Sequence, residues 1–258
     1  MKKLLLSAAM LAGLSALAAA PAMAQATGFV DANVGSLNLD AGGPDQDVDL
    51  MGIHGTVAFP VGEGLTLQGN LGFDHLDDPV DGDNVSASAN FGMRNANYAL
   101  GAYVAYKDNE LLDDKFLGFG GEYVYYMPQM TLSVGGGFGS YDDADADLYG
   151  ISGVGRYFVS DNLRIDGKVG YTNIDSGGEA DGIGAGIGAE WKPDNFPISI
   201  FGGYDFQTLD SGGTDTDISV WSIGARFDFG NGTLKARDRS GPAFRSAAGF
   251  DTAASGLF

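Results

Sequence analysis

The sequence has 258 residues, of which 34 are Asp or Glu, 14 are Lys or Arg and none is Cys, giving a formal net charge of −20 at pH 7. The lack of cysteine excludes disulfides and thiolate metal sites. The acidic excess leaves no basic surface that could neutralise phosphates, which excludes nucleic acid as a partner. Beyond the first 24 residues, no segment has the apolar length of a transmembrane helix or a sustained helical periodicity.

The first predicted element is a signal peptide over residues 1–24. Lys2 and Lys3 form a basic segment, an apolar run follows up to Ala20, and the small residues AMA precede Gln25. This order is typical of a secretory signal with its cleavage site, so we expect cleavage after Ala24. The mature chain is long enough for one large domain, which folds outside the cytoplasm.

Apolar and polar residues then alternate with the period of a β-strand in segment after segment. In SVWSIGARFDF, residues 219–229, every second residue from Trp221 to Phe229 is apolar, and the residues between are small or charged. The pattern predicts twelve strands, over residues 28–39, 48–61, 64–76, 84–94, 97–107, 116–127, 130–141, 148–159, 162–174, 182–192, 197–208 and 218–229.

The two faces of these strands differ in chemistry. When the apolar series is assigned to one face, the strand cations fall on the other, and Asp49 is an exception among the carboxylates. The second face is otherwise Gly, Ser, Thr and Asn, which indicates an enclosed, wet lumen. Aromatic residues gather near strand ends on the apolar face, as expected where a barrel meets lipid headgroups. In this register Leu71 faces lipid and Asn70 faces the lumen, so arginine should be tolerated better at 70.

The connections between the predicted strands also alternate. Those after the even-numbered strands are tight, whereas those after the odd-numbered strands are longer and acidic. Short turns on one side and longer loops on the other are typical of bacterial outer-membrane barrels. An even strand number also returns the end of the last strand to the periplasmic side.

The closing strand carries the most specific pattern. Ser222, Gly224, Phe227 and Phe229 match the polar-x-Gly-x-x-aromatic-x-aromatic pattern of barrel insertion signals. From residue 26 to 229 the chain resembles the bacterial outer-membrane β-barrel proteins of the porin-like class. In this sequence the signal is internal, because residues 230–258 follow it.

This resemblance implies an all-β fold, a single antiparallel transmembrane barrel over residues 25–229, with twelve strands and with ten or fourteen as alternatives. It implies the outer membrane of a Gram-negative bacterium as the location. The implied partners are outer-membrane lipids including lipopolysaccharide, the barrel assembly machinery during insertion, and small hydrophilic solutes. The leading function is passive diffusion of such solutes; the alternative is a non-conducting structural or surface-binding barrel with acidic, cation-interacting loops.

Charged residues on the lumen face are the candidate pore-lining residues. They are Arg94, Glu122, Arg156, Arg164, Asp166, Lys168, Glu190, Lys192, Asp205, Arg226 and Asp228. Because Arg156, Arg164, Lys168 and Lys192 come from three consecutive strands, we expect one basic wall and mild anion preference, since charge inside a pore selects ions by sign. The alternative is that these charges pair across a filled lumen. Glycines on the lumen face should leave open space.

Catalytic, metal and cofactor sites are not expected. His54 and His75 are the only histidines, and no serine or carboxylate spacing links them into a catalytic motif. The segment DDADAD, residues 142–147, lacks the glycine and the distal glutamate of an EF-hand loop. We therefore predict no enzyme activity, no bound metal and no cofactor.

The last segment, residues 230–258, differs in composition from the barrel. It is rich in small residues and holds Lys235, Arg237, Arg239 and Arg245. Weak patterning predicts a disordered periplasmic tail. The alternative is that the tail folds back into the periplasmic mouth or docks on a periplasmic partner.

Overall fold

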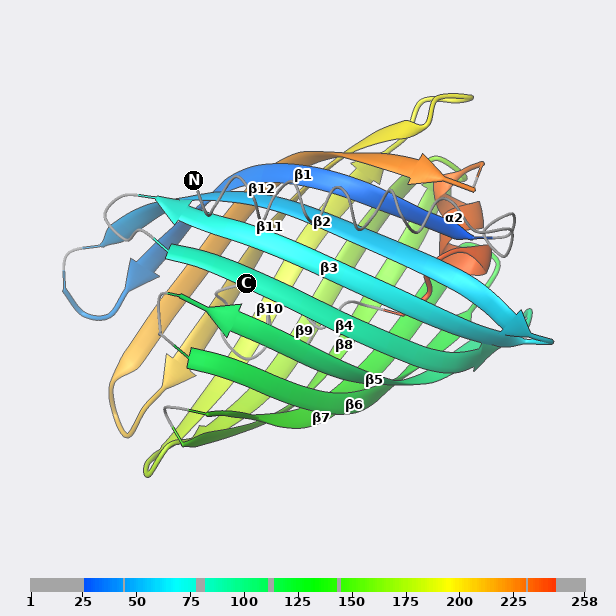
Figure 1. The fold of residues 1–258 in the computed structure, drawn as a ribbon. Helices are drawn as coiled ribbons and strands as arrows, with labels where there is room; N and C mark the ends of the chain where they lie inside the picture. The colour runs from blue at the N-terminus through cyan, green and yellow to red at the C-terminus, as the bar shows by residue number, and fades with distance from the viewer. Residues whose placement is uncertain are drawn as a thin grey trace, which may run out of the picture.

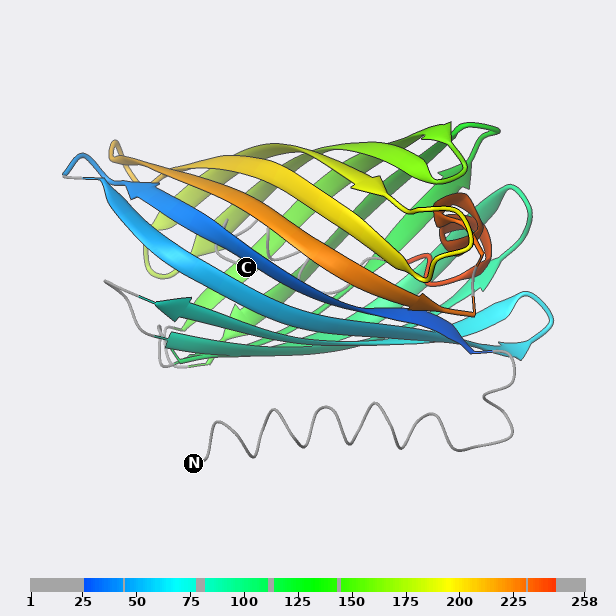
Figure 2. The ribbon, with the colours of Figure 1, turned by 90° about the horizontal axis from the view of Figure 1, so that it is seen from above.

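The computed structural model describes residues 26–43, 45–77, 82–110, 114–142, 145–230 and 232–244. These residues form one closed antiparallel β-barrel with a short helix at one mouth (Figures 1 and 2). The strands are β1 (Thr27–Asp40), β2 (Gln46–Gly62), β3 (Leu65–Asp77), β4 (Gly82–Arg94), β5 (Tyr98–Asn109), β6 (Asp114–Tyr126), β7 (Met130–Tyr141), β8 (Ala146–Ser160), β9 (Leu163–Asp175), β10 (Glu179–Trp191), β11 (Ile198–Asp210) and β12 (Asp215–Phe229).

The predicted strand number and fold class are confirmed. Each strand pairs with its neighbours in the chain, and β1 pairs with β12 from Gly28 opposite Phe229 to Asp40 opposite Asp217. Closure leaves no free strand edge. A membrane-spanning sheet must be closed in this way, because hydrocarbon offers no hydrogen-bond partners to unpaired backbone groups. No helix in the described part of the chain is long and apolar enough to span a membrane.

The acidic connections are shorter than the sequence predicts, because the strands extend into them. β10 begins at Glu179 and β12 at Asp215, each three residues before the predicted start. The backbone ladder continues there, with Asp181 opposite both Asn173 and Asp210. An acidic side chain at a hydrated rim can point into water while its backbone remains paired with the neighbouring strand. Acidic residues therefore do not terminate a strand there. The longest connection, residues 192–197, lies at the opposite end.

The two faces of the sheet have the predicted register. Large apolar side chains such as Leu71, Ile183 and Trp221 are exposed on the outside of the barrel. Polar side chains such as Gln68 and Asn90 are buried on the inside. A soluble monomer rarely exposes so large a continuous apolar surface, so this belt is the lipid-facing surface of a membrane-spanning barrel.

The inner wall is less open than the sequence predicts near the acidic connections. One buried apolar cluster there contains Phe116 and Leu148, with Tyr103 packed against it; a second consists of Leu37, Val48, Leu76 and Ile218. The expectation that the lumen glycines leave open space is wrong here. A Cβ atom on Gly118 would lie 2.7 Å from the Phe116 ring, and one on Gly120 would lie 2.6 Å from the Tyr103 hydroxyl. These glycines accommodate large neighbouring side chains.

The end of the chain does not follow the prediction of a disordered tail over its described part. After β12, Gly230 adopts φ of +77°, a left-handed conformation that favours glycine. The chain then enters the helix α2 (Leu234–Ser240), which lies in the mouth beside the tight turns (Figure 2). This matches the alternative in which the tail folds back. The predicted signal peptide, residues 1–24, and the tail residues 245–258 lie outside the described residues.

Candidate functional site

The helix α2 is anchored at its start to the turn between β8 and β9. Thr233 caps the helix, and its hydroxyl oxygen accepts a hydrogen bond from the backbone N–H of Ala236 at 3.0 Å. The N–H of Lys235 donates to the carbonyl of Asp161 at 3.0 Å, and the N–H of Leu234 to the side-chain oxygen of Asn162 at 3.3 Å. The free N–H groups of a helix start are thereby satisfied by the barrel itself.

Two adjacent charged residues connect the helix to the inner wall. Arg237 donates to Asp228 at 2.7 Å and also to Glu190. Asp238 accepts from Arg156 at 2.9 Å and from the hydroxyl of Thr131 at 2.6 Å. Both residues of α2 are buried. Breaking one partner of a buried ion pair costs about 3–5 kcal/mol, so these contacts hold α2 firmly in place.

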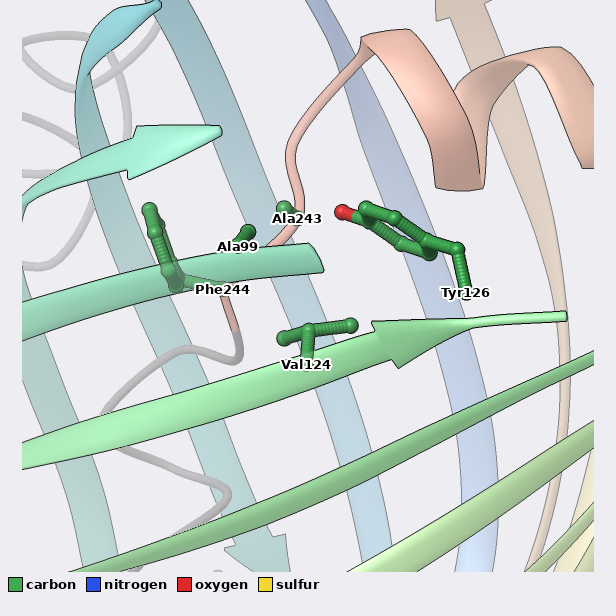
Figure 3. Close-up of a cluster of buried hydrophobic side chains, with 5 residues drawn as sticks. All are labelled: Ala99, Val124, Tyr126, Ala243 and Phe244. Carbon is green, nitrogen blue, oxygen red and sulfur yellow. The ribbon is translucent and has the colours of Figure 1, made fainter. Parts of the chain in front are cut away.

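The segment after α2 continues the attachment along β3–β6. The side chain of Arg94 donates to the carbonyl of Gly241 at 2.5 Å. Gln68 forms a two-way pair with the backbone of Phe244, whose N–H donates to the Gln68 side-chain oxygen at 3.1 Å. Phe244 and Ala243 also pack against inward side chains of β5 and β6 (Figure 3).

Glu190, on β10, is the centre of the ion-pair network. Its carboxylate accepts from Arg226 at 3.1 Å, from Arg237 and from the hydroxyl of Ser199, and it lies 3.2 Å from the guanidinium of Arg164. Side chains from three other strands and from the helix therefore meet at this carboxylate of β10. A buried carboxylate needs such partners, because desolvation otherwise disfavours its charge.

A cavity of about 350 Å³ lies beside this network inside the barrel. Its charged lining residues are Asp31, His54, Arg156, Arg164, Arg226, Arg237 and Asp238. Neutral polar groups of β2–β4 and the rings of Phe29, Phe201 and Phe244 complete the lining. The cavity is therefore charged on one side and neutral on the other, with the segment from α2 to Phe244 forming part of its wall.

The structure places ten of the eleven sequence-predicted lumen residues on inward-facing strand positions, and Lys192 directly follows the end of β10. Arg94, Arg156, Arg164, Glu190, Lys192, Arg226 and Asp228 surround α2 and the ion-pair network. Glu122 is buried on β6, and Asp166 lies 2.8 Å from Arg164. Lys168 and Asp205 form a separate pair at 2.8 Å.

The four cations predicted as one basic wall do not share one surface. Arg156 and Arg164 line the cavity, whereas Lys192 is buried against Asp228 at 2.8 Å. Lys168 pairs with Asp205 and does not line this cavity. The reason is that each of these four cations has a carboxylate neighbour, as the paired-lumen alternative anticipates. The basic wall is therefore divided into two cavity-facing arginines and two paired lysines.

Sequence reasoning did not assign Asp31, Arg237 or Asp238 to the site. Asp31 was the only carboxylate in the middle of the first strand, which is a usable signal for a lumen position. The helix α2 carries Arg237 and Asp238 beside one another, but seven residues give too little periodicity to predict a helix or its face. Only the fold shows which strand charges these residues meet.

The two histidines occupy separate places. His54 lies between two carboxylates, with Nδ1 3.1 Å from Asp31 and Nε2 3.0 Å from Asp74. His75 lies 2.8 Å from Asp83 on the neighbouring strand. A neutral imidazole has a single N–H, so two carboxylate partners favour the doubly protonated ring at His54. Among the described residues, no group of three His, Cys, Asp or Glu is arranged to hold a metal ion.

The residues of the predicted insertion signal lie on β12. Phe227 is exposed on the lipid-facing side, and Ser222 lies opposite Gly35 and Gly203 in the ladder. A Cβ atom on Gly224 would lie 2.5 Å from the Phe201 ring and 2.5 Å from a backbone carbonyl. Glycine at 224 therefore has a packing role in the folded barrel in addition to any part in insertion.

An outward-facing apolar belt and a closed antiparallel barrel with charged residues inside define an outer-membrane β-barrel. Solved structures agree with this class. An outer membrane channel from Pseudomonas putida F1 matches with a TM-score of 0.56 and 16% identity, over 80% of this chain and 96% of that chain. The NanC porin matches with a TM-score of 0.53 and 10% identity, over 77% of this chain and 100% of that one.

A third similar structure is the KdgM porin in complex with disordered oligogalacturonate, with a TM-score of 0.52 and 8% identity, over 76% of this chain and 99% of that one. No protein-family model matches the chain, and no curated protein matches it in sequence. At these identities the likeness establishes the fold. The predicted location, the outer membrane of a Gram-negative bacterium, agrees with the proteins that share this fold.

Proposed function

We propose that this protein is a porin-like channel that lets small hydrophilic solutes diffuse passively across the outer membrane. The observation that carries the proposal is a closed twelve-strand barrel with an apolar outside and a charged cavity of about 350 Å³ inside. A barrel of this size is wider than one that side chains alone usually fill. Channels and porins among the similar structures support the same class of function.

In this proposal α2 narrows the periplasmic mouth, so solutes pass beside it. The helix stands on one side of the mouth, held by Arg156, Asp228 and Glu190 (Figure 2). Lipopolysaccharide and other lipids surround the apolar belt, and the barrel assembly machinery reads the closing strand during insertion. The apolar belt supports the proposal of lipid partners, and the pattern of Ser222, Gly224, Phe227 and Phe229 supports that of the assembly machinery.

The alternative is a non-conducting structural or surface-binding barrel. Two observations favour it: α2 is attached through buried ion pairs, and apolar clusters narrow the inner wall at the acidic end. In that case the acidic rim would meet cations or lipid headgroups. The competing functions differ in one measurable property, which is ionic conductance.

Single-channel recording in a planar bilayer tests the proposal. The full-length mature protein and a chain that lacks residues 231–258 are refolded, and circular dichroism verifies their β-structure. We expect conductance from both, with a larger value for the truncated chain because α2 is absent. Conductance by the truncated chain alone would contradict passive diffusion through the native protein. The absence of conductance from both folded proteins would favour the non-conducting structural barrel.

A further inference from the structure

Arg226 presents a preorganised guanidinium to the cavity. Its centre lies 4.3 Å from the Phe29 ring centroid and 4.7 Å from that of Phe201. Its Nε donates to Asp31 at 2.9 Å, and one terminal nitrogen donates to Glu190 at 3.1 Å. Two rings and two carboxylates therefore fix the orientation of a group that would otherwise be flexible. Such preorganisation lowers the entropy cost of binding a ligand.

The charges around the cavity are exposed unequally. The side chains of Arg156, Arg164 and Arg226 retain 14%, 12% and 17% of their accessible surface. Their carboxylate partners Asp238, Glu190 and Asp31 retain 1%, 1% and 4%, whereas Asp166, a second partner of Arg164, retains 26% but does not line the cavity. Within the cavity lining, the arginines are therefore more exposed than Asp31 and Asp238, so a solute contacts mainly guanidinium groups.

The remaining wall of the cavity suits an apolar body with few polar atoms. The rings of Phe29, Phe201 and Phe244 lie along it, together with Ala243 and Pro242. Ser86 and Ser88 on β4 place hydroxyl groups on the wall. Thr56 and Asn70, which hydrogen-bond to each other, add neutral polar surface. A ligand that is anionic at one end and apolar elsewhere would meet complementary groups on every side.

We propose that this cavity is a binding site for a small organic carboxylate with an apolar body. The inference rests on the proposed function, since it assigns a substrate class to the same lumen. A carboxylate accepts two parallel N–H bonds from one guanidinium, which is the strongest pairing available to the cavity-facing arginines. Low-dielectric walls strengthen that contact relative to water. A cation in the cavity would instead meet three guanidinium groups, because the lining carboxylates Asp31 and Asp238 are less exposed than the arginines.

Isothermal titration calorimetry of the refolded full-length protein in detergent tests the site with benzoate as the probe. Benzamide, which is neutral and similar in shape, is the matched control ligand. We expect benzoate to bind at least about tenfold more tightly than benzamide, because a hydrogen bond to a charged group is worth about that factor or more. We also expect the affinity for benzoate to fall as salt is added.

The matched variants remove one ion pair each, so that no buried charge is left alone. Arg226→Gln with Asp31→Asn removes the oriented guanidinium and its partner, and it should weaken benzoate binding at least about tenfold. Lys168→Gln with Asp205→Asn removes a pair that lies outside the cavity, and it should leave binding unchanged. If the first variant does not fold, Arg156→Gln replaces it, since Asp238 keeps its contact with Thr131 and lies 3.6 Å from Arg239.

Three outcomes would overturn the inference: no heat with benzoate, equal affinity for benzamide, or equal loss of affinity in the control pair. The calorimetry does not depend on conductance, so the two proposals fail separately. Conductance without benzoate binding would support the channel proposal and contradict the binding-site proposal. Benzoate binding without conductance would support the binding-site proposal and contradict the channel proposal.

Discussion

Replacing Arg237 by glutamine should loosen the helix in the barrel mouth. The substitution removes a guanidinium that contacts Asp228 at 2.7 Å and also Glu190. Loss of a buried partner costs about 3–5 kcal/mol. We expect the lower value, about 3 kcal/mol, because Lys192 stays on Asp228 and Arg226 stays on Glu190. At 1.4 kcal/mol for each factor of ten, this corresponds to about a hundredfold increase in local opening.

Hydrogen exchange of the peptide that covers residues 232–244 measures this opening. The amides that report it are those of Arg237 and Gly241, which donate to Thr233 and Arg237 within the helix. Lys235→Gln is the matched control on the same helix, because Lys235 meets Asp161 in an exposed pair at 3.3 Å that is worth about 0–1 kcal/mol. Equal exchange rates in the two variants would refute the claim that buried ion pairs hold α2.

Two further predictions concern the barrel wall. Leu71→Arg places a charge on the outward face in the middle of β3 and should lower the free energy of unfolding by about 2–4 kcal/mol, whereas Leu65→Arg, beside the tight turn, should lower it by about 0–1 kcal/mol. Urea titration of the refolded proteins measures both, and equal losses would contradict the depth argument. Phe229→Ala should impair delivery to the outer membrane in cell fractionation, whereas removal of residues 231–258 should not; the opposite result would place the insertion signal in the tail.

Asn70→Arg, the inward neighbour of Leu71, is not the mild substitution that its lumen position alone predicts. Asn70 is buried, and its amide donates to Ser88 at 2.8 Å and to Asn90 at 2.9 Å. Its oxygen accepts from Thr56 and Gln68, each at 3.0 Å. An arginine would disrupt this network and leave buried polar groups without partners. Position along the strand gives the face of a side chain but not what surrounds it.

The barrel itself was predictable because its determinants are local. Alternation with period two fixes the face of each residue, and a one-residue error would move every apolar side chain into the lumen. Asp166 on β9 illustrates this: it occupies an inward-facing position and pairs with Arg164, two residues away on the same face of the strand. Closure of the sheet follows, because an unpaired strand edge in hydrocarbon would leave backbone groups without hydrogen-bond partners.

The contents of the lumen were not predictable from the same pattern. The contact between Asp238 and Arg156 joins residues that lie 82 positions apart, and the contact between Gln68 and Phe244 spans 176. Periodicity carries no information on such pairs. A short helix such as α2 is marginal on its own and is stabilised by its ion pairs and packing, so its sequence shows little helical signal.

Because the predicted basic wall is divided, substitutions at its cations should change the ion selectivity of the channel by different amounts. Arg164 and Lys168 lie on the same strand and carry the same charge, so glutamine at either position changes the lumen charge equally. They differ in surroundings: the Arg164 side chain is 12% exposed and lines the cavity, whereas Lys168 is 40% exposed beside Asp205. Salt screens exposed charges over about 8 Å at physiological strength.

Arg164→Gln should therefore shift the reversal potential in a salt gradient toward cation preference more than Lys168→Gln does. Low-dielectric walls focus the field of the Arg164 charge into the cavity, whereas water and Asp205 weaken that of Lys168. The difference between the two variants should widen as the salt concentration rises, because screening removes only the effect of Lys168. Planar-bilayer recordings at two salt concentrations measure this. A larger shift from Lys168→Gln would mean that ions are selected beside Lys168 and Asp205, away from the network around Glu190.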